Sequence, residues 1–307
     1  MTRISTFSQQ QAVVSQMLRA QSQVADDQRQ VATGYKTDSY KGIARDAAAL
    51  VSARAIESRT VQFVKLGQQV GAQVSLQDTG LTTMYDTAKN LRDSILKSLA
   101  NNRGDTVSVD MDSAFVSGKS VLNTRYAGKY LFAGSRTDVQ PFNATNISNL
   151  ATVATPIATF FDNSQQKAQV RIEQNTVIQY GLLANDIGSD MMASIKRMAE
   201  YNVATPFSQN LTPADRAILQ SEVASLDNVL SGIITLQANN GFVAKRIESI
   251  TTRNEALDTV NKQIIADLSE VDMAGAISKL NQDKLAVQSS YNLVRQLSQI
   301  TLLNFLS

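Results

Sequence analysis

Apolar residues recur every three or four positions along most of the chain, which predicts long amphipathic helices. The first such stretch, residues 1–33, contains neither glycine nor proline, and Gly34 follows as the predicted helix stop. Thr6 and Gln9 are expected to form a capping box near its start. Its broad apolar face consists of one stripe with Ile4, Phe7, Val14, Leu18, Ala25 and Ala32, and a second with Val13, Met17, Ala20, Val24 and Val31.

The end of the chain repeats this pattern. Residues 276–307 also lack glycine and proline, and they close with the apolar sequence ITLLNFLS. The main stripe consists of Ile277, Leu280, Val287, Tyr291 and Val294, beside a second with Leu293, Leu297 and Ile300 and a last group with Leu302, Leu303, Phe305 and Leu306. Such faces predict a partner surface, so we expect the two terminal helices to pair with each other and with copies of the chain. An ordinary helical bundle with helical ends is the alternative.

Further helices are predicted between the two ends. One runs from about residue 39 to about 102, and after a turn at 101–106 another continues to about 125. LTPAD at 211–215 is a typical helix start, with Thr212 as N-cap and Pro213 in the first turn. The stripe of the first long helix is Val70, Val74, Leu81, Met84, Ala88, Leu91 and Ile95, with Gln77 in one position. That of the second is Leu219, Val223, Leu226, Leu230, Ile233, Val243, Ile247, Ile250, Leu257, Ile264 and Leu268, with Asn254 and Asn261 in stripe positions.

The helical period fails between about 130 and 185. AQVRIEQNTVIQYG, residues 168–181, alternates apolar and polar positions around a Gln-Asn turn, which predicts a β-hairpin. The predicted fold class is therefore mainly α, a long-helix bundle or coiled coil formed by both termini with a small β-rich insertion in the middle. We predict five segments: terminal helices at 1–40 and 267–307, two halves of a helical core at 41–129 and 186–266, and the insertion at 130–185.

Composition removes several classes of function. The 307 residues include no cysteine and no histidine, which excludes disulfides, thiolate and histidine metal sites, and Ser-His-Asp catalysis. We expect no enzymatic activity, no metal and no cofactor. An enzyme would need a pair of carboxylates in a cleft, and we interpret the adjacent Asp26 and Asp27 as solvated surface.

Charge and hydropathy exclude two kinds of partner. The net charge is +2 and the basic residues are scattered, so no nucleic-acid surface is expected. No apolar run approaches the roughly 20 residues that span a bilayer, so membrane insertion is not expected. The first residues also lack the charged and apolar regions of a secretory signal. We expect either a cytoplasmic protein or one exported without a cleaved signal.

Both ends of the chain resemble the flagellin superfamily. Its amino-terminal helix typically opens with an R-I-S/N-T stretch and closes with a Ser/Thr-Gly-basic turn, here residues 33–36. Its carboxy-terminal helix has an acidic entry, matched here by Asp267, Val271, Asp272, Ala274, Ala276, Ile277, Ser278 and Leu280. In the superfamily these helices form the inner tube of a polymer. The resemblance implies an assembly interface, for which we predict Ile4, Phe7, Val14, Leu18, Ile277, Leu280, Val287, Leu297, Leu303 and Phe305.

A segment in the middle resembles the hook–filament junction family, the third hook-associated proteins. GKYLFAGSRTDVQPF, residues 128–142, matches their G-x-Y-L-F-A/S-G-x-x-T-x-x-x-P-F pattern at Gly128, Tyr130, Leu131, Phe132, Ala133, Gly134, Thr137, Pro141 and Phe142. In that family the segment leads from the helical core into an outer β-domain. We expect a strand anchored by its aromatic residues, a turn at glycine and a proline at an edge, and no ligand site.

The resemblance implies a structural subunit of the bacterial flagellum. Such a subunit forms a ring of copies that joins the first hook-associated protein to flagellin, and it is exported through the flagellar channel with help from an export chaperone and the export apparatus. Flagellin itself is the alternative, although its typical tail, Q-A-N-x-x-P-Q-x-x-L-x-L-L, is replaced here by VRQLSQITLLNFLS. An unrelated secreted helical protein, such as a needle-tip component or an adhesin, would have heptads but not both flagellin-like ends.

Overall fold

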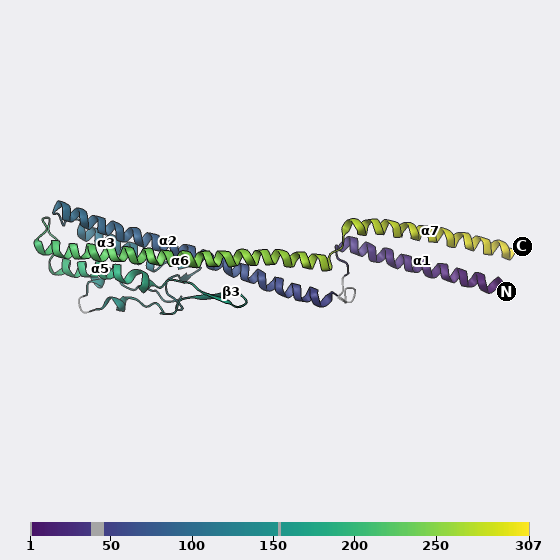
Figure 1. Cartoon of the computed structure of the whole chain (residues 1–307), viewed down its shortest axis with the longest axis horizontal. Coiled ribbons are helices and arrows are strands. Elements are labelled where there is room, and N and C mark those ends of the chain that lie inside the picture. Colours follow the sequence, from purple (N-terminus) through teal and green to yellow (C-terminus); the bar gives the residue numbers. More distant parts are fainter. Residues whose placement is uncertain (1, 38–45, 153–154, 307) are drawn as a thin grey trace. The chain divides into compact units, whose positions relative to one another are not determined.

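The computed structural model describes residues 2–37, 46–152 and 155–306, and long helices dominate it (Figure 1). The helices are α1 (Thr2–Thr33), α2 (Ala47–Asn101), α3 (Val107–Leu122), α4 (Ile147–Leu150), the 3-10 turn η2 (Ile157–Phe160), α5 (Ala184–Ala204), α6 (Pro213–Ser269) and α7 (Met273–Leu306). The strands form two antiparallel hairpins, β1 (Arg125–Tyr126) with β2 (Lys129–Tyr130) and β3 (Gln169–Glu173) with β4 (Thr176–Gln179). The predicted class, mainly helical with a small insertion that contains strands, is confirmed.

Contacts divide the chain into two compact units. One unit comprises Met1–Thr60 with Ala256–Ser307, and the other comprises Val61–Glu255. The long helices α2 and α6 contribute residues to both. The five-segment division made from the sequence stays a prediction.

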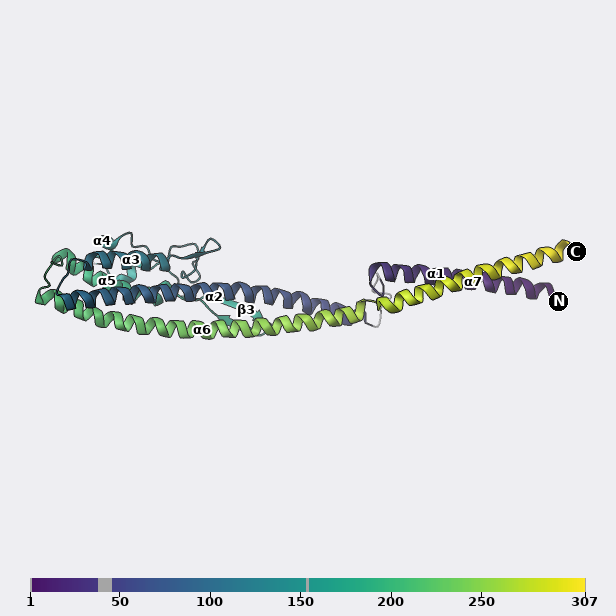
Figure 2. The same cartoon turned by 90° about the horizontal axis from the view of Figure 1, so that it is seen from above.

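Four helices build the core of the unit Val61–Glu255. Helices α2 and α6 run side by side (Figure 2), and α3 and α5 pack on them. The core includes Leu81, Met84, Leu91 and Ile95 of α2, Met111, Phe115 and Leu122 of α3, Ile187, Met191, Ile195 and Met198 of α5, and Leu219, Leu226 and Ile233 of α6. Every stripe residue predicted for α2 is buried, Gln77 included, so the heptad pattern identified the core face correctly.

In the predicted stripe of α6, the apolar positions are right as far as Ile250, and the stripe positions of Asn254 and Asn261 are right as well. Beyond Ile250, Leu257 and Ile264 are 49% and 43% exposed, whereas Asn254 and Asn261 are buried. The Asn254 side chain donates a hydrogen bond of 2.8 Å to the Ile172 carbonyl of strand β3. A polar residue is therefore stable at this buried position, since it satisfies a backbone acceptor.

The predicted start of α6 is confirmed. Thr212 and Asp215 form a reciprocal capping box: the Asp215 amide donates to the Thr212 hydroxyl at 3.2 Å, and the Thr212 amide donates to the Asp215 carboxylate at 2.8 Å. The Tyr201 hydroxyl of α5 also donates to Asp215, at 2.7 Å. One carboxylate thus joins the helix start to a neighbouring helix.

Other predicted boundaries differ from the structure. The capping box at Thr6 and Gln9 is wrong, because α1 begins at Thr2 and both residues lie inside the helix. Helix α3 ends at Leu122 rather than near Arg125, because the β1–β2 hairpin begins there. The predicted start of the second helix near residue 39 lies outside the described residues. Gly34 ends α1 as predicted, with a φ of 77° that favours glycine.

The segment GKYLFAGSRTDVQPF fastens the insertion to the helical core. Phe132 and Phe142 are fully buried, and the Phe142 ring packs edge-on against Phe115 of α3 with centroids 6.2 Å apart. The Phe142 amide and carbonyl both bond the Asn123 side chain, at 3.1 and 2.9 Å. This aromatic anchor confirms the expected role, but the expected strand is only two residues long. After Tyr130 the backbone turns, because the backbone groups of the following residues form their hydrogen bonds with several separate loops.

The hairpin β3–β4 packs on α2 and α6. Ile172 and Ile178 form a second apolar cluster with Val70 and Val74 of α2 and Ile247 and Ile250 of α6. Helices α2 and α6 approach closely here, since a Cβ atom on Gly67 would lie 2.1 Å from the Thr251 hydroxyl. The glycine therefore permits the helix contact that supports the predicted hairpin.

Candidate assembly surface on the terminal helices

A short antiparallel junction fixes the end of α1 against the start of α7. The Val271 amide donates to the Gly34 carbonyl at 2.9 Å, and the Lys36 amide donates to the Ser269 carbonyl at 2.8 Å. Tyr35 and Glu270 form the bridge between these two bonds. The Lys36 ammonium also donates to the Asp267 carbonyl. These bonds set the register of the two helices, which then run antiparallel and side by side (Figure 1).

The acidic entry of α7 is a helix cap. The Asp272 side chain accepts a hydrogen bond of 3.1 Å from the Ala274 amide, as an N-cap residue does. Ala276 and Leu280, one and two turns further on, are 7% and 8% exposed and face α1. The acidic-entry pattern of the sequence therefore contains residues of three features. These are the junction to α1, the cap of α7 and the first two positions of the contact between the two helices.

The contact between α1 and α7, called here the terminal seam, follows positions three and four residues apart on both helices. It comprises Val13, Met17, Ala20, Val24, Asp27 and Val31 of α1 and Ala276, Leu280, Asp283, Val287, Ser290 and Val294 of α7. The second apolar stripe of α1 is therefore the one that faces α7. Most of these side chains are only partly buried, so the seam is less dry than the core of the other unit.

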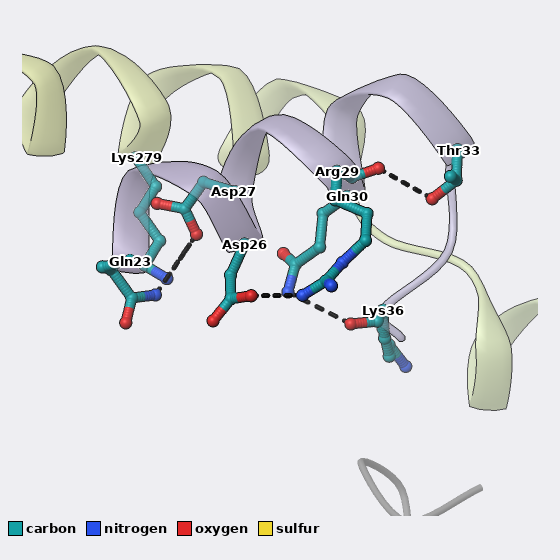
Figure 3. A network of polar contacts seen from close by, with 8 residues as sticks. All are labelled: Gln23, Asp26, Asp27, Arg29, Gln30, Thr33, Lys36 and Lys279. Carbon is teal, nitrogen blue, oxygen red and sulfur yellow. Dashed lines mark hydrogen bonds and ion pairs between the residues drawn. The ribbon is translucent and has the colours of Figure 1, made fainter. Parts of the chain in front are cut away.

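Asp27 corrects the interpretation of Asp26 and Asp27 as solvated surface. The side chain of Asp27 is 1% exposed and accepts a hydrogen bond of 2.9 Å from Lys279 of α7 (Figure 3). Asp26 is exposed, as predicted, and pairs with Arg29 on its own helix. The helical period explains the difference, because Asp27 follows Val24 by three residues and precedes Val31 by four, which places it in the seam.

Burial and bonding act in opposite directions on Asp27. Burial alone would raise the pKa of its carboxyl, but the hydrogen bond from Lys279, the neighbouring Asp283 carboxyl and the hydrogen bond from Gln23 outweigh burial and lower that pKa. Gln23 donates from the same helix at 3.3 Å. The ion pair with Lys279 therefore joins α1 to α7 through a charged, buried group.

The outward faces of the two helices expose large apolar side chains. Leu18 of α1 is 57% exposed, and Leu285 and Leu293 of α7 are 64% and 54% exposed. Among the predicted interface residues, Leu18 and Ile277 point outward, Leu280 is buried in the seam, and Val14 and Val287 are partly buried. The side chains of Ile4, Phe7, Leu297, Leu303 and Phe305 lie outside the described residues, although their backbones belong to α1 and α7.

A cleft of about 350 Å³ in the larger unit is lined by Gln73 and Gln77 of α2 and by Tyr126, Tyr130 and Tyr180, with no aspartate or glutamate in its wall. Among the described residues, no cluster of aspartates and glutamates could hold a metal ion. None of the described helices has the length and apolarity to cross a bilayer.

Two family models match the two ends of the chain. Residues 4–137 match the bacterial flagellin N-terminal helical region, and residues 223–306 match the bacterial flagellin C-terminal helical region. The chain belongs to the flagellin family. The two matched regions contain both terminal helices, the junction and most of α2 and α6. No curated protein matches the chain in sequence.

Solved structures share the fold at low sequence identity. A Vibrio parahaemolyticus protein assigned as a flagellar hook-associated protein is 14% identical with a TM-score of 0.59, over 73% of this chain and 97% of that one. FlgL from Bacillus cereus is 13% identical with a TM-score of 0.54, over 71% and 99%. FlgL from Xanthomonas campestris is 14% identical with a TM-score of 0.55, over 70% and 99%. Nearly the whole of each of these chains is thus matched by the fold described above.

Proposed function

We propose that this protein is a structural subunit of the bacterial flagellum and that it forms the hook–filament junction. Copies of the chain form a ring, with the first hook-associated protein on one side and flagellin on the other. The subunit reaches this place through the flagellar channel, with an export chaperone and the export apparatus as transient partners. Membership of the flagellin family and the fold shared with hook-associated proteins support this assignment.

The observation that carries the proposal is the terminal helix pair with its exposed leucines. Leu18, Leu285 and Leu293 are each more than half exposed in the single chain. Burying such a side chain stabilises an assembly by about 1.5–3 kcal/mol relative to leaving it in water. Because the α1–α7 pair leaves these leucines uncovered, contacts with neighbouring subunits along the flagellar axis are the natural way to bury them.

Flagellin remains the second candidate. The matched family models describe flagellin helical regions, which favours a filament subunit as much as a junction subunit. The small insertion and the aromatic anchor at residues 128–142 favour the junction. Copy number and position separate the two functions, because a filament subunit occurs along the whole filament.

Immunogold electron microscopy of intact flagella with an antibody against residues 130–185 tests the assignment. We expect gold at a single point between hook and filament. Gold along the whole filament would assign the chain as a flagellin. Absence of gold from every flagellum, while the same antibody detects the protein in sheared flagellar fractions, would exclude an accessible junction position.

A substitution tests whether the outward face of α1 carries assembly. Leu18→Asp places a charge on that face, where burial against a neighbour would be strongly unfavourable, so we expect filament-bearing cells to become rare. Val203→Asp is the matched control, because Val203 is 71% exposed on α5 and undergoes the same change in charge. Circular dichroism should show equal helix content for both variants. Normal filaments on Leu18→Asp cells would show that this face makes no essential contact.

A further inference from the structure

The terminal seam contains a second carboxylate beside Asp27. Asp283 of α7 occupies the seam position that follows Leu280 by three residues, and its Oδ2 atom is shielded from water. The Oδ2 atoms of Asp27 and Asp283 both lack a hydrogen-bond donor among the described residues. Two ionised carboxylates only accept hydrogen bonds, so neither can satisfy the other. A proton between them would satisfy both.

The charged groups around this pair are few. Lys279 of α7 donates to Oδ1 of Asp27, and Gln23 of α1 donates to the same oxygen. Asp26 belongs to a separate, exposed pair with Arg29. Among the described residues, the Lys279 ammonium is therefore shared by two carboxylates in a partly buried helix contact. Like charges on neighbouring carboxylates oppose each other's ionisation.

We propose that Asp27 and Asp283 share one proton in the terminal seam, and that this proton controls how firmly α1 and α7 pair in the free subunit. With the proton present, the two carboxyls form one hydrogen bond across the seam. Without it, they repel each other and oppose the apolar contacts of Ala276 and Leu280. This inference goes beyond the proposed function, because it concerns the single subunit before assembly.

The directions of the two pKa shifts agree with this arrangement. The neighbouring Asp27 carboxyl, with which a protonated Asp283 could hydrogen-bond, raises the pKa of Asp283 above its ordinary value of 3.8, and burial and the Asp27 charge act in the same direction, while the pKa of Asp27 is lowered. A raised pKa stabilises the helix pair below the ordinary value, and this contribution is lost as pH rises through the raised pKa. The lowered pKa of Asp27 acts oppositely and matters only in stronger acid. Pairing should therefore be firmest in mild acid and weaker at neutral pH.

The absence of cysteine allows a direct test in the full-length chain. Arg19→Cys and Ser289→Cys place two spin labels on exposed positions of α1 and α7. Double electron–electron resonance then gives the ratio of paired to separated helices between pH 4.5 and 8. In the otherwise unchanged chain we expect this ratio to fall severalfold as the pH rises.

Two variants of the labelled chain make the test specific. Asp283→Asn supplies an amide donor to Asp27 without a second negative charge, so the paired fraction should be high at every pH and nearly constant. Asp26→Asn is the matched control and should keep the full pH dependence, because Asp26 lies outside the seam. The proposal is overturned if Asp283→Asn titrates like the parent chain, or if the parent chain shows no pH-dependent pairing. Neither result would affect the position found by immunogold labelling.

Discussion

The helical core and the terminal helix pair both place apolar residues three or four positions apart, but the buried contacts that result are different. In the core, helix α2 contributes Leu81, Met84, Leu91 and Ile95, and each of these residues is 2% exposed or less. In the terminal seam, the most buried apolar residues are Ala276 and Leu280, at 7% and 8%, and the positions between them and Val287 include a carboxylate. The core buries its large apolar side chains almost completely, whereas the terminal pair has a polar seam and apolar outer faces.

This difference separates the region that stabilises the fold from the region that we propose for assembly. A close-packed core with buried aromatic residues stabilises the fold through contacts within one chain. A seam with an ion pair and a second carboxylate gives helices whose pairing depends on the protonation of the seam. Regions that must rearrange or join a partner are generally drawn from the less stable part of a protein. The terminal helices therefore suit assembly because they are incompletely satisfied alone.

The largest expected effect concerns the aromatic anchor. Phe132→Ala removes a fully buried ring that packs against Gly80 of α2, so the core should lose about 3–5 kcal/mol of its free energy of unfolding. Phe242→Ala is the matched control: Phe242 is 77% exposed on α6, and we expect a change within about 0.5 kcal/mol. Urea unfolding followed by circular dichroism measures both. Equal losses would mean that Phe132 does not anchor the core.

A smaller effect distinguishes the pH behaviour of the two regions. Burial alone would raise the pKa of Asp215, but hydrogen bonds from the Thr212 backbone, Tyr201 and the Thr212 side chain lower it. Its stabilising contribution is therefore present above the ordinary value of 3.8 and is lost as pH falls through the lowered pKa. This is the opposite sign to Asp283 in the seam.

Asp215→Asn should reduce the free energy of unfolding of the core by about 1.5–3 kcal/mol at pH 7 and by less at pH 3. Asp105→Asn serves as the control, since Asp105 forms an exposed pair with Arg103 and its loss should leave the core unchanged. Thermal unfolding at the two pH values gives the comparison. A loss that is the same at both pH values would show that the charge of Asp215 does not matter.

The smallest expected effect is that of removing the terminal helices. A fragment of residues 46–269 retains all of α2 and α6 and the complete core. We expect it to unfold cooperatively at nearly the same temperature as the whole chain, because every residue of the two buried apolar clusters lies within this fragment. A drop of more than a few degrees would mean that the terminal helices stabilise the core and that the two regions are not separable.

The sequence predicted most of the helices because burial in long helices follows a regular period. The stripe of α2, the stop at Gly34 and the start at Thr212 needed only local rules. Helix α5 was predicted only as part of the range 186–266, since its face is interrupted by Lys196, which is buried through bonds to the Leu150 and Thr152 carbonyls. Such compensation by distant backbone acceptors is not visible in a local pattern.

The candidate site was predictable in outline but not in its polar detail. The pairing of both ends and the exposed face at Leu18 followed from the two apolar stripes of α1. Asp27 was missed because charge was taken as a sign of exposure, although its position in the second stripe predicted burial. Asn254 is buried at its predicted stripe position, but its bond to Ile172, a residue more than eighty positions away, could not be read from the local pattern, and neither could the exposure of Leu257.

The backbone closure of the insertion also shows where an outer domain can be enlarged. The Ala184 amide donates to the Phe132 carbonyl at 2.9 Å, so the chain leaves the core and returns to it at adjacent points. Between these two residues, Phe142, Leu150 and Ile172 are buried in the apolar clusters, so most of the insertion belongs to the packed fold. The turn between β3 and β4, at residues 174 and 175, is exposed. A longer turn at that point leaves the buried contacts in place, so the same scaffold can display a larger outer domain, or a foreign epitope, without redesign of its core.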